Sequence, residues 1–144
     1  MDNLPGRVVP VNTIAIGAVA GMETASEHTL RYTKEREAFG RNIFGVQNSK
    51  FTLAEVATEA KWPASSPTTP SPNTFGQLDI PTVAMAKWWT TDRAMSVAHE
   101  CLQLHGGYGY MQEYPISRMW VDNRVRMICA GTNEIMKEII ARAL

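Results

Sequence analysis

The sequence predicts an all-α fold, an antiparallel four-helix bundle, on three observations. Apolar and small residues recur at three- and four-residue spacing in separate stretches of the 144-residue chain, as they do on one face of a helix. Glycine or proline stands beside these stretches, where helices end or begin. No stretch competes as a strand. Because each amphipathic helix must bury its apolar stripe against the others, we expect one bundle.

The first helix is expected from Thr13 to Glu37, after an irregular start at residues 1–12. Gly40 supplies a stop, and Arg36 lies in the final turn, where a cation meets the negative end of the helix dipole. The predicted apolar stripe consists of Ile14, Ala18, Met22, Ala25 and Tyr32.

The second helix is expected to start near Val46 and to stop before Pro63, because proline lacks the N–H donor and clashes with the preceding turn. Residues 61–79 are rich in Pro, Ser and Thr, and this composition predicts an extended loop. An ordered loop of this length is uncommon inside a compact domain. The predicted apolar residues of this helix are Phe51, Leu53, Ala54, Ala57 and Ala60.

The third helix is expected from about Pro81, which suits a first helical turn, to about Leu104, before a run of glycines. A short helical piece should open at Pro115. The last helix should begin after Thr132, with its inward residues at Ile135, Ile139 and Ala143.

Composition limits the classes of function. Lysine and arginine balance aspartate and glutamate at 14 each, so no net field favours nucleic acid or an anionic membrane. The two cysteines, Cys101 and Cys129, form neither a disulfide framework nor a zinc motif, which favours a reducing cytoplasm and no metal. The longest apolar run, Ile14 to Met22, is too short to span a membrane. We expect a single cytoplasmic domain over residues 1–144.

The segment from Gln103 to Tyr110 is the first candidate site. Three glycines within four positions are costly unless the backbone takes unusual dihedral angles or approaches a ligand closely. On spacing alone a helix C-cap followed by a turn is the favoured explanation, and a ligand contact stays open as the alternative.

The second candidate is the segment from Gly131 to Glu134. Thr132 can cap the last helix, whose free N–H groups favour an anion or a carbonyl oxygen, and the Glu134 carboxylate suits the helix dipole. An ordinary N-cap or a cofactor contact would each account for it.

The third candidate combines Arg36, Phe39, Gly40 and Gln47 at the end of the first helix. A guanidinium there could pair with a phosphate, and an aromatic ring could cover a planar group. The alternative is a solvated helix end with Phe39 in the core.

Together these motifs resemble the acyl-CoA dehydrogenase family in order, spacing and identity, along nearly all of residues 14–61 and 80–144. The chain is similar to the C-terminal helical domain of that family, and its tail resembles long-chain and branched-chain members most. The resemblance implies FAD as cofactor, an acyl-CoA thioester as substrate, an electron-transfer flavoprotein as acceptor, and a homo-oligomer, either dimer or tetramer.

The resemblance also implies a role for each motif. The turn after the first helix would contact the pyrophosphate and adenosine side of FAD, the segment after the third helix would reach FAD across a subunit interface, and the last helix would begin against the flavin. The implied substrate-binding residues are Arg7 and Gly131. The implied cofactor-binding residues are Arg36, Phe39, Gln47, Gln103, Leu104, Gly106, Gly107, Thr132 and Glu134.

The implied reaction removes an α-proton from the thioester and delivers a β-hydride to the flavin, which requires a carboxylate base in a dry site. Most members place that glutamate immediately before the Gly-Thr of the last helix, where this chain has Ala130. Long-chain and branched-chain members place it on the first helix, and neither the residues after Leu4-Pro5 nor Pro10 and Val11 supply one. We therefore expect no catalytic residue in this chain.

Two hypotheses follow. The chain is either the C-terminal part of an FAD-dependent acyl-CoA dehydrogenase, which we do not expect to be active alone, or a non-catalytic helical bundle or decayed fragment that keeps only flavin-contact and packing surfaces. Residues 61–77, where the family pattern is lost and then regained, fit either a compensated reading-frame shift or a tolerated insertion.

Overall fold

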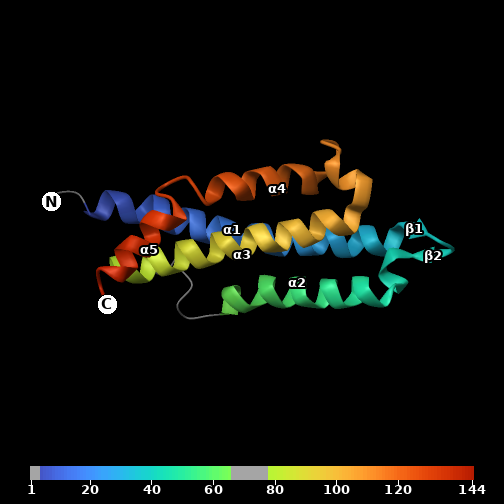
Figure 1. Ribbon diagram of the computed structural model, residues 1–144, viewed down its shortest axis with the longest axis horizontal. Coiled ribbons are helices and arrows are strands. Elements are labelled where there is room, and N and C mark those ends of the chain that lie inside the picture. Colours follow the sequence, from blue (N-terminus) through green and yellow to red (C-terminus); the bar gives the residue numbers. More distant parts are fainter. Residues whose placement is uncertain (1–3, 66–77) are drawn as a thin grey trace.

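The computed structural model describes residues 4–65 and 78–144, and it confirms the all-α bundle. Figure 1 shows α1 (Leu4–Glu35) and α3 (Ile80–His105) running side by side in the same direction through the centre. α2 (Gln47–Ser65) and α4 (Pro115–Arg126) run the opposite way on either side of this pair. The short α5 (Asn133–Ala141) lies across the end of the bundle nearest the N-terminus.

Small side chains bring the two central helices together. Ala15, Ala18 and Ala25 of α1 and Ala94 and Ala98 of α3 are all 0% exposed. The distance between packed helices depends on the side chains at their contact, so alanines allow a close approach. The core around this pair contains Ala18, Val19, Met22, Ala25, Val56, Ala60, Ala94, Val97, Cys101 and Ile116.

A second, smaller core fixes α5 to the bundle. Met136 of α5 is buried with Val11 of α1 and with Val83 and Ala84 of α3. Lys137 covers the neighbouring Trp88 ring, with its ammonium 5.0 Å from the ring centroid. None of the helices in the described parts of the chain has the length and apolar content needed to cross a membrane.

The predicted irregular start is wrong for residues 4–12, because α1 begins at Leu4 rather than Thr13. Pro10 lies inside this helix although it cannot donate a backbone hydrogen bond. Val11 and Asn12 are only 9% and 1% exposed, so packing of this segment holds the helix against the local preference.

The expected stop before Pro63 is also wrong, since α2 continues to Ser65. Pro63 lies in the last turn of the helix and is fully buried, so its packing offsets the backbone hydrogen bond that proline cannot donate. The remainder of the predicted loop, residues 66–77, lies outside the described residues.

A short hairpin that the sequence did not predict follows α1. β1 (Glu37–Ala38) pairs antiparallel with β2 (Arg41–Asn42), so α1 ends at Glu35, two residues earlier than expected. Phe39 and Gly40 join the strands with φ angles of 55° and 77°. Two positive φ angles in a two-residue loop are those of a type I′ turn. The 3₁₀ helix η1 (Ile43–Gly45) then leads into α2.

Several side chains expected in the core are exposed. Phe51 of α2 and Ile135 of α5 are 58% and 52% exposed, and Ala143 is exposed as well. Val56 and Met136 are buried instead, at 2% and 4%. In α2 and α5 the buried stripe is therefore rotated from the predicted one, because neighbouring helices select the face that is covered.

Candidate functional site

A pocket of about 510 Å³ lies where α1, the hairpin and the end of α3 meet. It brings together five of the residues predicted to bind a cofactor, although they come from segments about 70 positions apart in the chain. These five are Arg36, Gln103, Leu104, Gly106 and Gly107, and the other lining residues are Tyr32, Ala38, Ile43, His105, Tyr108 and Met111.

Arg36 presents an uncompensated cation to this pocket. Its backbone N–H extends the hydrogen bonding of α1 by donating to Tyr32 (2.8 Å). Its guanidinium carbon lies 5.0 Å from the centroid of the Tyr108 ring, a cation–π geometry. Among the residues that the structure describes, no carboxylate lies within ion-pair distance of Arg36. The guanidinium is therefore available to an anionic ligand.

Aromatic packing fixes the turn that follows α3. The His105 ring stacks on Tyr32, with centroids 4.1 Å apart, and the Tyr32 hydroxyl donates to the His105 carbonyl (3.2 Å). The Nδ1–H group of His105 donates to the Cys101 carbonyl (2.8 Å). Burial lowers the pKa of His105 and thereby favours the neutral imidazole. The sequence placed Tyr108 inside the first candidate segment without a role of its own. It did not indicate Tyr32 as a site residue, because an aromatic residue at helical spacing usually indicates core.

The glycine-rich turn itself is a 3₁₀ helix, η3 (Gly106–Tyr110). Gly106 closes α3 as its C-cap with a φ of 56°, so the C-cap interpretation of this segment is confirmed. No atom lies within 4 Å of a Cβ built on Gly106 or Gly107, so nothing in the described chain fills the space beside these two glycines. Their backbone is therefore open to a ligand on the pocket side.

Phe39 and Gln47 lie near this pocket in the chain but do not line it. Phe39 is at the tip of the hairpin and is 103% exposed, so the alternative that placed it in the core is wrong. Gln47 is the first residue of α2 and is exposed. Arg7 lies in α1, and its side chain is outside the described part of the structure.

The other predicted contacts, Thr132 and Glu134, lie at the start of α5. Thr132 is the N-cap, and its hydroxyl accepts a hydrogen bond from Ile135 N–H (3.4 Å), which confirms the predicted cap. Hydrogen bonds from its own backbone N–H and from Thr132 lower the pKa of the exposed Glu134. Glu134 also lines a second pocket, of about 420 Å³, beside Trp120 and Arg124.

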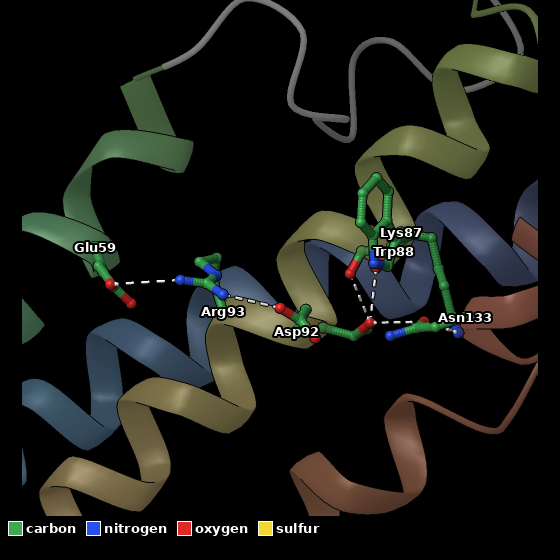
Figure 2. A network of polar contacts seen from close by, with 7 residues as sticks. Glu59, Lys87, Trp88, Asp92, Arg93 and Asn133 are labelled. Carbon is green, nitrogen blue, oxygen red and sulfur yellow. Dashed lines mark hydrogen bonds and ion pairs between the residues drawn. The ribbon is translucent and has the colours of Figure 1, made fainter. Parts of the chain in front are cut away.

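Lys87 holds the start of α5 through hydrogen bonds, and the sequence did not identify it as a site residue. It lies on α3, is 0% exposed, and donates to the Gly131 carbonyl (2.8 Å) and to Asn133 Oδ1 (2.9 Å). Figure 2 shows its side chain reaching Asn133. The sequence alone does not show whether an isolated lysine within an apolar helical stripe is buried or exposed.

The two groups of predicted contacts lie at opposite ends of α3. Lys87, which contacts Gly131, and Gln103, which lines the first pocket, are 16 positions apart on this helix. At 1.5 Å per residue that separation is roughly 24 Å along the helix axis. The structure therefore brings Arg36 together with Gln103 but not with Thr132.

The first pocket fits one end of a dinucleotide cofactor. An unpaired guanidinium suits a diphosphate, and the backbone of Gly106 and Gly107 is open to close approach. The Phe39 ring, free at the hairpin tip, suits a planar group. Among the described residues, no cluster of His, Cys, Asp or Glu could hold a metal ion.

Comparison with known proteins decides the family. The profile of the acyl-CoA dehydrogenase C-terminal domain matches residues 12–144. The chain belongs to the acyl-CoA dehydrogenase family, as its C-terminal domain. The long-chain specific acyl-CoA dehydrogenase of Mus musculus mitochondria is 41% identical over 100% of this chain. This similarity confirms the predicted kinship with long-chain members.

Solved structures agree with this assignment to the acyl-CoA dehydrogenase family. The acyl-CoA dehydrogenase of Geobacillus kaustophilus matches 95% of the chain with 41% identity and a TM-score of 0.86. A structure described as an electron transferring flavoprotein of Acidaminococcus fermentans matches 92% with 32% identity and a TM-score of 0.83. The chain spans 33% of the mouse relative and 36% of the Geobacillus chain, so it corresponds to about one third of these proteins.

Proposed function

We propose that this chain is the C-terminal part of an FAD-dependent oxidoreductase that dehydrogenates acyl-CoA thioesters between the α and β carbons. The observation that supports it best is the pocket at the end of α3, which is lined by the Arg36 guanidinium, stacked on Tyr108, and by the open backbone of Gly106 and Gly107. When bound, FAD would supply the hydride acceptor that no amino-acid side chain provides.

The residues of this chain would hold FAD rather than carry out the chemistry. Arg36 would pair with the diphosphate as a fork of N–H donors, and Phe39 would cover a ring of the adenosine side. Gln47 and Gln103 would offer amide hydrogen bonds, and Leu104 an apolar wall. At the other end of α3, Thr132 and Glu134 would contact the flavin, and Gly131 and Arg7 the thioester substrate.

We further propose a homo-oligomer, dimer or tetramer, in which two copies complete one FAD site. The separation of Arg36 and Gln103 from Thr132 along α3 supports this arrangement, because a second copy could bring its pocket to the first copy's α5. An electron-transfer flavoprotein is the proposed acceptor. The proposed location is a reducing compartment, the cytoplasm, since both cysteines are free thiols.

A non-catalytic bundle is the second candidate, and the lack of a glutamate at both positions where the family resemblance places the base favours it. Neither Ala130 nor Pro10 and Val11 can accept the α-proton. Exposed Met85 (42%) and Trp89 (41%) suit a domain that packs against further protein, whether or not that protein is catalytic.

One experiment tests the flavin-holding role that the first candidate requires. The chain is purified without added cofactor, its visible spectrum is recorded, and dye-linked reduction is followed with acyl-CoA thioesters of several chain lengths. Bound yellow flavin that survives gel filtration, or FAD that binds on titration, supports the flavin-holding role. A colourless protein that does not bind FAD on titration contradicts that role for this chain and leaves the non-catalytic bundle.

A further inference from the structure

Lys87 is a fully buried cation with neutral partners only. Its Nζ donates to the carbonyls of Gly131 (2.8 Å) and Met127 (3.3 Å) and to Asn133 Oδ1 (2.9 Å), which uses all three N–H donors of an ammonium group. No carboxylate among the described residues lies within ion-pair distance of it. Figure 2 shows this side chain beside Asn133. The ammonium group is therefore held by oriented dipoles rather than by a counter-ion.

The three acceptors span the whole connection between α4 and α5. Met127 follows α4, and Asn133 is the first residue of α5. Between them, Ala130 and Gly131 both have positive φ, 53° and 100°, a conformation that costs energy at the alanine. Ile128, Cys129 and Ala130 are exposed, so no buried apolar side chain anchors this stretch.

Asn133 ties the same network to α3 a second time. The Thr91 hydroxyl, one turn after Lys87 on α3, donates to Asn133 Oδ1 (3.1 Å). The Asn133 backbone N–H donates a hydrogen bond to the Met127 carbonyl (3.0 Å). The start of α5 is thus fixed relative to α3 through polar contacts that converge on two buried residues, Lys87 and Asn133.

Burying a cation here costs desolvation free energy that packing alone does not require. Burial lowers the pKa of Lys87, the signature of an ammonium removed from water, and Cys129 and Glu134 only partly offset it. A methionine of similar length would fill the space without desolvating a charge. What methionine cannot do is orient two carbonyl groups and an amide oxygen at once.

We infer that Lys87 is a positioning residue, which holds the connection from Met127 to Asn133 so that Thr132 and the first N–H groups of α5 face the flavin. This inference rests on the proposed function, which places Thr132 and Glu134 against FAD. Lys87 acts through the Gly131 carbonyl and Asn133, and it does not itself contact the cofactor. The expected consequence is that loss of the ammonium loosens this connection locally and weakens FAD binding.

The test compares Lys87→Met with Val97→Ala, a matched core variant ten positions further along α3. Val97 is 1% exposed and contacts the main core, not the connection, so its truncation lowers stability without touching the polar network. Two properties are measured at a temperature where both variants are folded: hydrogen exchange of the Cys129 and Asn133 amides in the flavin-free chain, and the dissociation constant for FAD.

Lys87→Met should speed exchange of these two amides by about tenfold or more and weaken FAD binding by about tenfold, the factor that losing one charge-assisted hydrogen bond supports. Val97→Ala should change neither, although its melting temperature also falls. Lys87→Gln, which keeps two N–H donors, should give intermediate values, and it replaces Lys87→Met if that variant does not fold.

Equal exchange rates in the Lys87 and Val97 variants would overturn the inference, because the connection would then not depend on the ammonium. Faster exchange with unchanged FAD affinity would overturn the positioning role as well, since the loosened segment would not matter for the cofactor. If the unmodified chain binds no FAD, the proposed function fails and the positioning role fails with it, whereas the exchange data separately decide whether Lys87 holds the connection.

Discussion

At the scale of single residues, Phe39 combines two features that cost stability. Its φ of 55° is rare for a bulky side chain, and its ring is 103% exposed, so no packing compensates for the strain. Asparagine followed by glycine is the preferred pair for a type I′ turn, and glycine already stands at position 40. A phenylalanine at this place is better explained by a ligand contact than by the turn.

Phe39→Asn should therefore stabilise the chain and weaken its cofactor binding. We expect the free energy of unfolding to rise by about 1 kcal/mol, since the strained left-handed conformation is relieved and no core is lost. Urea denaturation measures this, and FAD titration of the same sample measures affinity. A variant that gains stability and binds FAD as tightly as the parent would show that the ring has no role in the site.

His105 predicts a pH dependence of stability at mildly acidic pH. Burial lowers its pKa in the folded chain below the usual 6.5, so the unfolded chain binds more protons in this range. The free energy of unfolding should then fall as the pH drops below about 6.5 and level off below the folded-state pKa. Denaturant titrations between pH 7.5 and 5 measure it, and His105→Gln should remove this part of the slope. If the free energy of unfolding of the variant keeps the same pH dependence, another titratable group causes it.

At the scale of elements, the tight turn after α3 depends on one buried glycine. A Cβ on Gly109 would lie 2.6 Å from the Leu102 carbonyl oxygen, a backbone atom that cannot move aside alone. Gly109→Ala should destabilise the chain by about 1–3 kcal/mol, the usual cost of overpacking. Gly107→Ala is the matched control, because nothing lies within 4 Å of its Cβ, and it should be nearly neutral. Thermal melts of the two variants measure the difference, and equal melting temperatures would contradict this account.

The sequence predicted those helix ends that are determined by neighbouring residues. α3 begins at Ile80 and ends at His105, each within one residue of the expected bound, because a proline in the first turn and a glycine C-cap are strong local signals. The Thr132 N-cap was predictable for the same reason. These features depend on a few neighbouring residues, so the sequence alone contains them.

The features that the sequence did not reveal depend on distant residues. α1 extends back to Leu4 because Val11 packs against α3 and α5, and α2 passes Pro63 because that ring is buried. The pocket likewise requires α1 to lie beside α3, which places Arg36 and Tyr108 in contact. Burial of Lys87 could not be predicted, since its acceptors lie 40 to 46 positions away.

At the scale of the whole molecule, the candidate site is divided. One end of α3 has the guanidinium and the glycine-rich turn, and the other end has Thr132 and the connection that Lys87 holds. The chain also spans only about one third of its relatives, 33% of the mouse protein. Under the proposed function, a complete catalytic centre therefore requires protein beyond one copy of this chain.

Ala130→Glu is the variant that tests this requirement. The new carboxylate would stand where the family resemblance places the base of most members, and the backbone at this position, with a φ of 53°, strains alanine and glutamate alike. We expect no dye-linked reduction with any acyl-CoA thioester, because a base accelerates proton removal only when the substrate is held against it in a water-free site. A chimaera that adds the first two thirds of a relative to the same variant is the positive control. Turnover by the variant chain alone would show that these helices already hold the thioester.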